Sequence, residues 1–260
     1  MRIGNKIDYK RLEELLTVHN IEEATIFDIL GRMRVLVDLF KETSEFYHLS
    51  PFIKTYYWVT KSVAEKLMGN EHFYNNPRKV RMLDVHFATL YFKPLREYII
   101  NGISLNPWNN YFAISKKHNM PFLQLILGIN AHINGDLATS LIHLEYKEEH
   151  DFDQVNLILG GLVNNIMRYL AFEEKDIFGL MGVVFDDFVY NEFSKIIVGW
   201  RSNAYNNAKI IAGKKDKHYF LQKIGDQTEE IALKLEYIFT KEMTSPIKLV
   251  QDLNNLQTTL

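Results

Sequence analysis

The chain has no cysteine among its 260 residues, and it has little proline or glycine. Without cysteine it can form no disulfide, no thiolate nucleophile and no cysteine-ligated zinc or iron–sulfur site. Six prolines and thirteen glycines leave room for long helices with short connections. These absences exclude several kinds of site and favour a helical protein.

Long apolar runs and an excess of one charge are missing as well. No segment approaches the ~20 apolar residues of a membrane-spanning helix, and the polar N-terminus lacks the apolar core of a signal peptide. The formal net charge is −2, which provides no general basic field for nucleic acid. We therefore expect a soluble cytoplasmic protein that neither spans a membrane nor binds nucleic acid.

Hydrophobic residues make up 47% of the chain and recur mostly at helical spacing. This pattern predicts an all-α, single-domain multi-helix bundle over 1–260, with roughly seven to ten helices. The predicted parts are N-terminal helices over 8–41, a core over 51–213, C-terminal helices over 216–243 and a frayed tail over 247–260.

The stretch over residues 123–145 is the longest strongly apolar one in the chain. Four polar residues near its middle stand where core packing alone would not place them: Asn130, His132, Asn134 and Asp136. A buried polar group is unfavourable unless it is hydrogen-bonded or bound to a ligand. The pattern therefore predicts a buried polar central helix that carries the functional site.

Helical geometry groups these side chains. At about 100° per residue, Asp136 lies about 40° and His143 about 20° from His132, so the three form one stripe. Asn130 and Asn134 form a second i,i+4 pair on another face. Histidine and aspartate at this spacing can share a metal ion, or the aspartate can hold the imidazole in one tautomer. The structural alternative is a polar network that cross-links buried helices.

Candidate partners for the stripe lie on other predicted helices. His86 sits among inward-facing residues near the middle of the helix that follows Pro77, and Tyr91 lies further along the same helix. Trp200 and Arg201 are adjacent on a later apolar helix. An arginine in such a place can pair with a buried carboxylate or bind an anionic ligand.

Further expectations concern packing. Gly135 predicts a close approach of another helix or a ligand to the central helix. Tyr56 belongs to a run of three aromatic residues that cannot all face one side of a helix, so one is a candidate for lining a cavity, beside ordinary core packing. Residues 101–121 are predicted to be an irregular connection anchored by Trp108, and Arg32 is interpreted as surface charge.

Three segments together resemble a mainly bacterial family of uncharacterised all-α proteins: NAHINGDLA (130–138), HFATLYF (86–92) and WRSNA (200–204). The family signature is Asn-Ala-His-Ile-Asn-x-Asp-Leu, preceded by a Phe-Ala-x-x-Tyr helix, and the similarity runs from Pro51 to Gly213. This resemblance implies an all-α fold and singles out these residues, but it implies no activity.

The pattern His132-x-x-x-Asp136 followed by His143 is similar to the helical motif of zinc-dependent phospholipases C and single-strand nucleases. Those are all-α enzymes that hydrolyse phosphoesters, and the resemblance implies zinc or another divalent metal held by His86, His132, Asp136 and His143. The chain departs from that family, whose next histidine lies slightly closer to the aspartate and whose usually secreted chain begins with a metal-binding tryptophan. The departure argues against a three-zinc cluster and leaves one or two metal ions.

Three functions are compatible with these observations. The first is a metal-dependent hydrolase of a small phosphoester or otherwise anionic substrate, in which the ion lowers the pKa of a water to about 7. The second is a metal-independent enzyme in which His132, polarised by Asp136, acts as general acid–base. The third is a non-catalytic helical binding or scaffold protein whose polar stripe is structural.

The enzyme hypotheses assign roles to named residues. The predicted catalytic residues are His132, Asp136, Asn130 and Asn134, and the predicted substrate-binding residues are Arg201, Tyr91 and Trp200. The expected partner is a small-molecule substrate, and a homo-oligomer is compatible with the sequence. The expected cofactor is zinc or another divalent metal for the first function and none for the others.

Overall fold

The computed structural model describes residues 2–3, 6–69, 72–176, 186–242 and 246–260. This part of the chain is helical nearly throughout, which confirms the all-α prediction. Near the N-terminus, β1 (Arg2–Ile3) and β2 (Lys6–Ile7) form a short antiparallel pair with Arg2 opposite Ile7.

The helices follow in chain order. The first group is α1 (Tyr9–Leu16), α2 (Ile26–Glu42), η1 (Tyr47–Leu49), α3 (Ser50–Gly69), α4 (Pro77–Arg96) and η2 (Glu97–Asn101). The second group is α5 (Asn109–Lys117), α6 (Pro121–Ile129), η3 (Asn130–Asp136), α7 (Leu137–His143) and α8 (Glu149–Phe172). The last group is α10 (Asp186–Ala212), α11 (Lys217–Tyr237), η4 (Ile238–Glu242) and α12 (Pro246–Asn254).

Capping residues mark where several helices begin. Thr25 and Asp28 form a reciprocal capping box at the start of α2, which satisfies two backbone donors that the first turn would leave free. Asn76 caps α4, and Pro77 follows at the first helical position, where its missing N–H costs no hydrogen bond. Asp216 caps α11 in the same way. Local sequence thus explains these boundaries.

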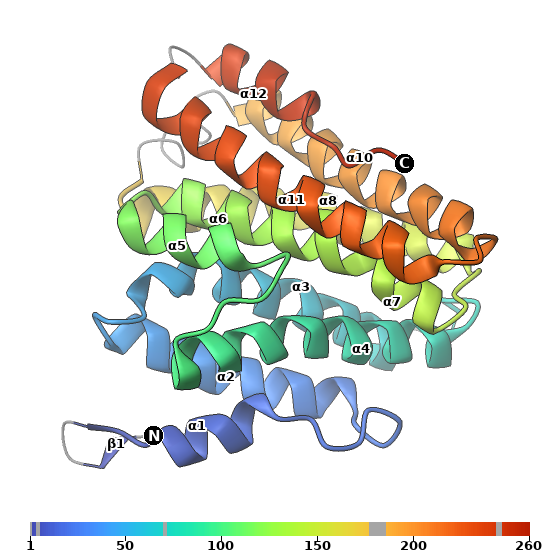
Figure 1. Cartoon of the computed structure of the whole chain (residues 1–260), viewed down its shortest axis with the longest axis horizontal. Coiled ribbons are helices and arrows are strands. Elements are labelled where there is room, and N and C mark those ends of the chain that lie inside the picture. Colours follow the sequence, from blue (N-terminus) through green and yellow to red (C-terminus); the bar gives the residue numbers. More distant parts are fainter. Residues whose placement is uncertain (1, 4–5, 70–71, 177–185, 243–245) are drawn as a thin grey trace.

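The run α6–η3–α7 lies in the middle of the protein. Figure 1 shows the N-terminal helices below it and α10, α11 and α12 above it. It packs on α3 and α4 on one side and on α10 and α11 on the other. All residues of α6 and η3 are buried, because neighbouring helices cover the run on every side.

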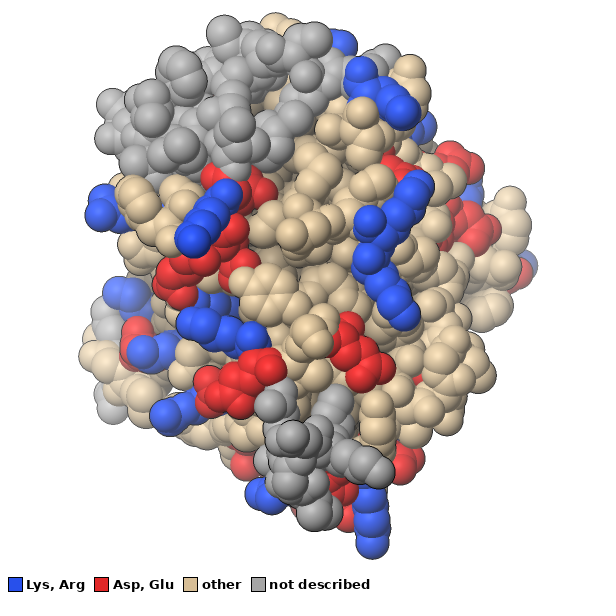
Figure 2. All heavy atoms as spheres, turned by 90° about the vertical axis from the view of Figure 1, so that its left-hand side faces the viewer, with Lys and Arg blue, Asp and Glu red and all other residues tan. Residues whose placement is uncertain are grey.

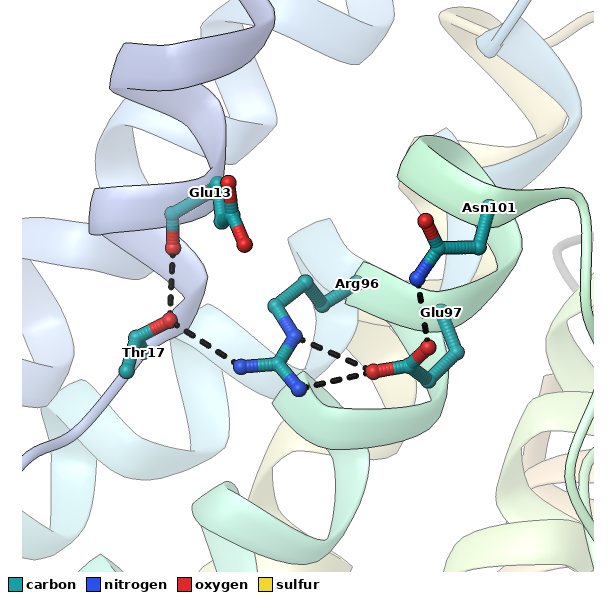
Figure 3. A network of polar contacts seen from close by, with 5 residues as sticks. All are labelled: Glu13, Thr17, Arg96, Glu97 and Asn101. Atoms are coloured by element: carbon teal, nitrogen blue, oxygen red, sulfur yellow. Dashed lines mark hydrogen bonds and ion pairs between the residues drawn. The ribbon is translucent and has the colours of Figure 1, made fainter.

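Two arginines hold the C-terminal end of α1. Arg32 of α2, interpreted from the sequence as surface charge, donates from Nη1 to the carbonyl oxygens of Glu14 (3.1 Å) and Thr17 (3.0 Å). Arg96 donates to the hydroxyl of Thr17 at 3.3 Å and to the carboxylate of Glu97 (Figure 3). The last carbonyls of a helix lack backbone partners, so a cation there stabilises the helix end.

The C-terminal tail differs from its prediction. Residues 247–260 were expected to fray, but they contain most of α12, and Leu253 of this helix and Leu256 after it are buried. The carbonyl oxygen of Thr258 accepts a hydrogen bond from Asn203 of α10 at 2.6 Å. Apolar residues at helical spacing and this contact anchor the tail, although its composition is polar.

The connection over 101–121 is also more regular than predicted, because it contains α5. Trp108, which precedes α5, is fully buried, so this segment belongs to the core.

By length and composition alone, α8 could cross a membrane, a test that the core helix of a soluble protein also passes. On the face shown in Figure 2, Lys and Arg are interspersed with Asp and Glu around uncharged surface.

Candidate functional site

The polar centre of the central run is a π-helix, η3, in which all residues over 130–136 are buried. Its i→i+5 hydrogen bonds widen each turn, and such segments are rare and frequent at functional sites. A Cβ on Gly128 would lie 2.4 Å from the ring of Phe52, and one on Gly135 would lie 2.3 Å from Pro107. The close approach predicted at Gly135 is therefore made by a proline of the loop before α5.

Asn130 and Asn134 contact each other and link the central run to α11. Asn134 donates from Nδ2 to Oδ1 of Asn130 at 3.0 Å, and Asn130 donates from Nδ2 to the carbonyl oxygen of Thr228 at 2.9 Å. The hydroxyl of Thr228 donates in turn to the carbonyl of Ile224 at 2.9 Å. These bonds give the asparagine pair a role in packing two helices together.

His132 lies in a box of aromatic rings from α3 and α4. Its ring stacks on Phe87 with centroids 3.4 Å apart, and Tyr56 meets it edge-on at 4.5 Å. Burial lowers the pKa of His132 well below its ordinary value of 6.5, and the positive charge of Arg201 lowers it further. The imidazole is therefore neutral at physiological pH.

Asp136 orients this imidazole through one of its nitrogens. Oδ2 of Asp136 lies 3.4 Å from Nδ1 of His132, and it accepts a hydrogen bond from Nε1 of Trp108 at 2.9 Å. Burial raises the pKa of Asp136 well above 3.8, and the Trp108 hydrogen bond opposes this rise. Nε2 of His132 is enclosed and has no hydrogen-bond partner among the described residues. An imidazole held at one nitrogen with the other free has the arrangement of a general base.

His132 lines a chamber of about 70 Å³ between α3, α4, α6, η3, α8 and α10. Apolar and aromatic side chains form most of its wall, and the ionisable residues in it are His132, Tyr56 and Arg201. The half-buried part of the wall includes Gly160 of α8 and Ser194 of α10. One water needs about 10–15 Å³ on this scale, so the chamber accommodates a small molecule or several waters.

A second chamber of about 50 Å³ shares Tyr56, Phe87 and Arg201 with the first. Asp84 and Tyr146 supply further polar groups to its wall. Oδ2 of Asp84 and the hydroxyls of Tyr56 and Tyr146 are enclosed and have no hydrogen-bond partner among the described residues. Buried polar atoms are nearly always paired, so a cluster of unpaired ones indicates a place for bound water or a ligand.

Arg201 stands between the two chambers. Its Nε donates to Oδ1 of Asn156 at 2.7 Å, and its guanidinium lies over the ring of Phe152, 4.4 Å from the centroid. Burial lowers the pKa of Arg201 to about 10, so the side chain remains charged at neutral pH. The prediction that Arg201 can face an anionic ligand is compatible with this position.

His86 and His143 form a separate pair between α4 and α7. Their rings stack with centroids 4.3 Å apart, and Nδ1 of His86 lies 3.0 Å from the hydroxyl of Ser140. Burial, with a smaller effect from the charge of His143, lowers the pKa of His86 to about 4. His86 directly precedes Phe87, and consecutive helical side chains point about 100° apart, so His86 faces α7 while Phe87 faces His132.

The four residues predicted as metal ligands therefore lie in two pairs, His132 with Asp136 and His86 with His143. In the part of the chain that the structure describes, no group of three or more His, Asp or Glu side chains is placed to hold a metal ion. The π-helix explains the difference, because its wider turns rotate α7 away from the α-helical projection that aligned His143 with His132. The four side chains therefore do not form one group in the structure, and zinc binding stays a prediction.

Of the three residues predicted to bind substrate, Arg201 alone lines either chamber. Tyr91 packs in the core, with its ring centroid 4.9 Å from that of Trp108 and 5.1 Å from that of Phe52. Trp200 is buried, and its Nε1 has no hydrogen-bond partner among the described residues.

Several residues that complete the site had weaker signals in the sequence. Trp108 was interpreted as an anchor of a loop, although its indole holds Asp136. Tyr56 was one of three candidates for lining a cavity, and it lines both chambers. Phe87 and Asn156 had no distinguishing feature, because contact between distant helices leaves no mark in sequence spacing.

Replacing Asp84 with Asn is expected to change how stability depends on pH. Burial raises the pKa of Asp84 to about 7, and Arg201 partly offsets the rise. A carboxyl whose folded-state pKa exceeds its unfolded value of about 3.9 destabilises the fold progressively as pH rises between the two values. Asp84→Asn removes this loss, so the variant should gain roughly 1–3 kcal/mol relative to wild type between pH 4 and pH 8.

Urea unfolding at pH 4, 6 and 8 measures this difference. The exposed Asp38→Asn provides the control and should differ from wild type by the same small amount at each pH. If the free energies of unfolding of wild type and Asp84→Asn differed by the same amount at all three pH values, the claim that burial raises the pKa of Asp84 would be contradicted.

A family model matches residues 26–238, which run from α2 to the end of α11 and include every candidate site residue. Its description is a family of unknown function. No curated protein and no solved structure matches the chain. The chemistry of the chambers is therefore the basis for a function.

Proposed function

We propose that this chain, which belongs to the family of unknown function DUF5995, is a metal-independent enzyme that uses His132 as its acid–base group. The substrate would be a small organic molecule held in the buried chamber. The observation that carries this proposal is the state of His132, a residue that lines the chamber. Its Nδ1 faces Asp136, and its Nε2 is enclosed without a hydrogen-bond partner among the described residues.

The arrangement explains how the imidazole would work. Trp108 can only donate from Nε1, so Oδ2 of Asp136 accepts that bond. We take Asp136 as the carboxylate, which can only accept, and therefore assign the hydrogen of the imidazole to Nδ1. Nε2 then keeps a free lone pair and can take a proton from a bound molecule. Asp136 is a positioning residue that holds the tautomer and stabilises the imidazolium formed during the transfer.

Proton transfer to and from carbon is the reaction class that these groups support best. Neutral His132 can remove a proton beside a carbonyl or carboxyl group, and the same imidazolium can return it. The aromatic wall excludes bulk water, which strengthens electrostatic interactions with the charge that develops. Thr55 of the chamber wall is not an activated nucleophile, since its hydroxyl has no hydrogen-bond partner among the described residues.

Exchange of carbon-bound hydrogen in D₂O tests the proposal. Wild-type protein incubated with small carboxylic acids and ketones is expected to catalyse hydrogen–deuterium exchange at the carbon beside the carbonyl, measured by ¹H NMR. His132→Gln should lower the rate by about 10²–10⁴-fold, the usual contribution of a general base. His118→Gln is the matched control, because His118 contacts Glu236 at 2.7 Å and lines neither chamber.

The same assay separates this proposal from metal-dependent hydrolysis, which stays a prediction from the faint similarity to zinc phospholipases. Treatment with EDTA should leave the exchange rate unchanged. Exchange that persists in His132→Gln would contradict the role of the imidazole. Stoichiometric zinc, lost in His132→Ala, would favour the metal-dependent hydrolase instead.

A further inference from the structure

Arg201 is a buried cation without a direct ion pair in the part of the chain that the structure describes. Its residue surface is 5% exposed, and no described carboxylate lies within 4.0 Å of its guanidinium nitrogens. A buried charge is strongly unfavourable unless an opposite charge or hydrogen bonds compensate it. Its one hydrogen bond to a described residue uses Nε, which leaves the two terminal nitrogens available.

The guanidinium is held in a fixed plane. Asn156 fixes its Nε edge, and the ring of Phe152 covers one of its faces. The planar fork of an arginine matches the two oxygens of a carboxylate, which accept parallel hydrogen bonds. A guanidinium that is oriented before a ligand arrives loses little conformational freedom when the ligand binds.

Further donors converge on the same space. Tyr146 and Tyr56 line the second chamber together with Arg201, and their hydroxyls are enclosed without partners among the described residues. Buried tyrosine hydroxyls usually find a hydrogen-bond partner. Asp153 and Asp84 offer the rival explanation, because their carboxylates act on Arg201 at longer range and could balance it without any ligand. Asp153 also accepts a hydrogen bond from Asn156 at 3.2 Å.

We propose that Arg201 anchors the carboxylate of a small monocarboxylate, with the hydroxyls of Tyr56 and Tyr146 as additional donors. The apolar body of the ligand would extend into the first chamber, whose wall is aromatic and aliphatic around His132. One buried cation compensates one negative charge, so a phosphate dianion would leave a charge unpaired. The inference rests on the proposed function because it assigns the substrate class of the same site.

Ligand binding to the intact protein tests this inference without any assay of turnover. The probes are hexanoate and benzoate, their neutral amides hexanamide and benzamide, and inorganic phosphate, each followed by titration calorimetry and by thermal unfolding. Wild type should bind at least one carboxylate at least 10-fold more tightly than its amide and should not bind phosphate. Arg201→Met should weaken that carboxylate at least 30-fold and leave the amide unchanged.

Two further variants test the carboxylate site in case Arg201→Met does not fold. Tyr146→Phe removes only a hydroxyl that has no described partner, so it should fold normally and bind the carboxylate several-fold more weakly. Gly160→Leu should fill part of the chamber and abolish binding. The neighbouring Gly161→Leu is its control, because the added side chain lies in open space and binding should equal that of wild type. Arg168→Met, an exposed arginine of the same helix as these glycines, is the charge control.

The outcomes separate the two proposals. Wild-type protein that binds the carboxylate but catalyses no hydrogen exchange would contradict only the proposed function. Equal affinity for acid and amide, unchanged carboxylate binding in Arg201→Met, or failure of wild type to bind either acid would overturn the anchor. In each of these cases Asp153, Asp84 and water would balance the charge of Arg201.

Discussion

Replacing Gly135 with Ala is expected to destabilise the protein by roughly 2–4 kcal/mol, through overpacking at a site that cannot relax. The added Cβ would lie 2.3 Å from Cγ of Pro107, closer than real Cβ contacts allow. Gly128→Ala should behave similarly, because its Cβ would lie 2.4 Å from the ring of Phe52. Phe52 has little freedom to move, since aromatic rings surround it.

Urea unfolding measures both effects, with Gly31→Ala as the control. Gly31 lies on the exposed side of α2 with open space around it, so alanine there should raise stability by about 0.5–1 kcal/mol through helix propensity. An equal gain at Gly135 and Gly31 would show that the central run is not in close contact with Pro107. A loss at Gly135 and Gly128 alone would support the packing of η3 against its neighbours.

Replacing Asp136 with Leu is expected to lower stability by roughly 2–4 kcal/mol. The substitution keeps the approximate shape but leaves the buried Nε1 of Trp108 without its acceptor, and a buried donor without a partner is strongly unfavourable. The substitution also removes the hydrogen-bond partner of Nδ1 of His132. Asp136→Asn should lose less than Asp136→Leu, because its amide oxygen can still accept from Trp108 and because it removes a carboxyl whose ionisation burial disfavours.

A double-mutant cycle isolates this hydrogen bond. Trp108→Phe removes the donor, so the double variant with Asp136→Leu should be more stable than the sum of the two single losses, by about 1–2 kcal/mol. The exposed Asp38→Leu combined with Trp108→Phe should show additive effects. Additivity for Asp136 and Trp108 would contradict the bond that positions the imidazole.

The sequence predicted the helical architecture because apolar spacing and caps are local signals. Contacts one helical turn apart are also local and were predicted from spacing. The pairs His132–Asp136 and Asn130–Asn134 are both hydrogen-bonded in the structure. The π-helix was not predictable from spacing, and it separated His143 from that stripe. Over a few residues a change of helix type matters little, whereas over eleven it changes the face on which a side chain lies.

The enclosure of the site depends on contacts between distant helices. Phe87 stacks on His132 across more than forty positions of sequence, and Asn156 meets Arg201 across a similar interval. No periodicity encodes such pairs. The position of Arg32 shows the same limit, since surface charge and a cap for another helix have the same sequence pattern.

The protonation state of His132 is the most direct test of the central claim, that its Nε2 is a free base in the chamber. Ring ¹⁵N shifts, assigned by comparison with His132→Gln, report which nitrogen carries hydrogen. We predict hydrogen on Nδ1, an unprotonated Nε2, and no protonation between pH 8 and pH 5, because burial holds the pKa of His132 well below 6.5. Hydrogen on Nε2, or titration at the ordinary value of about 6.5, would contradict the account.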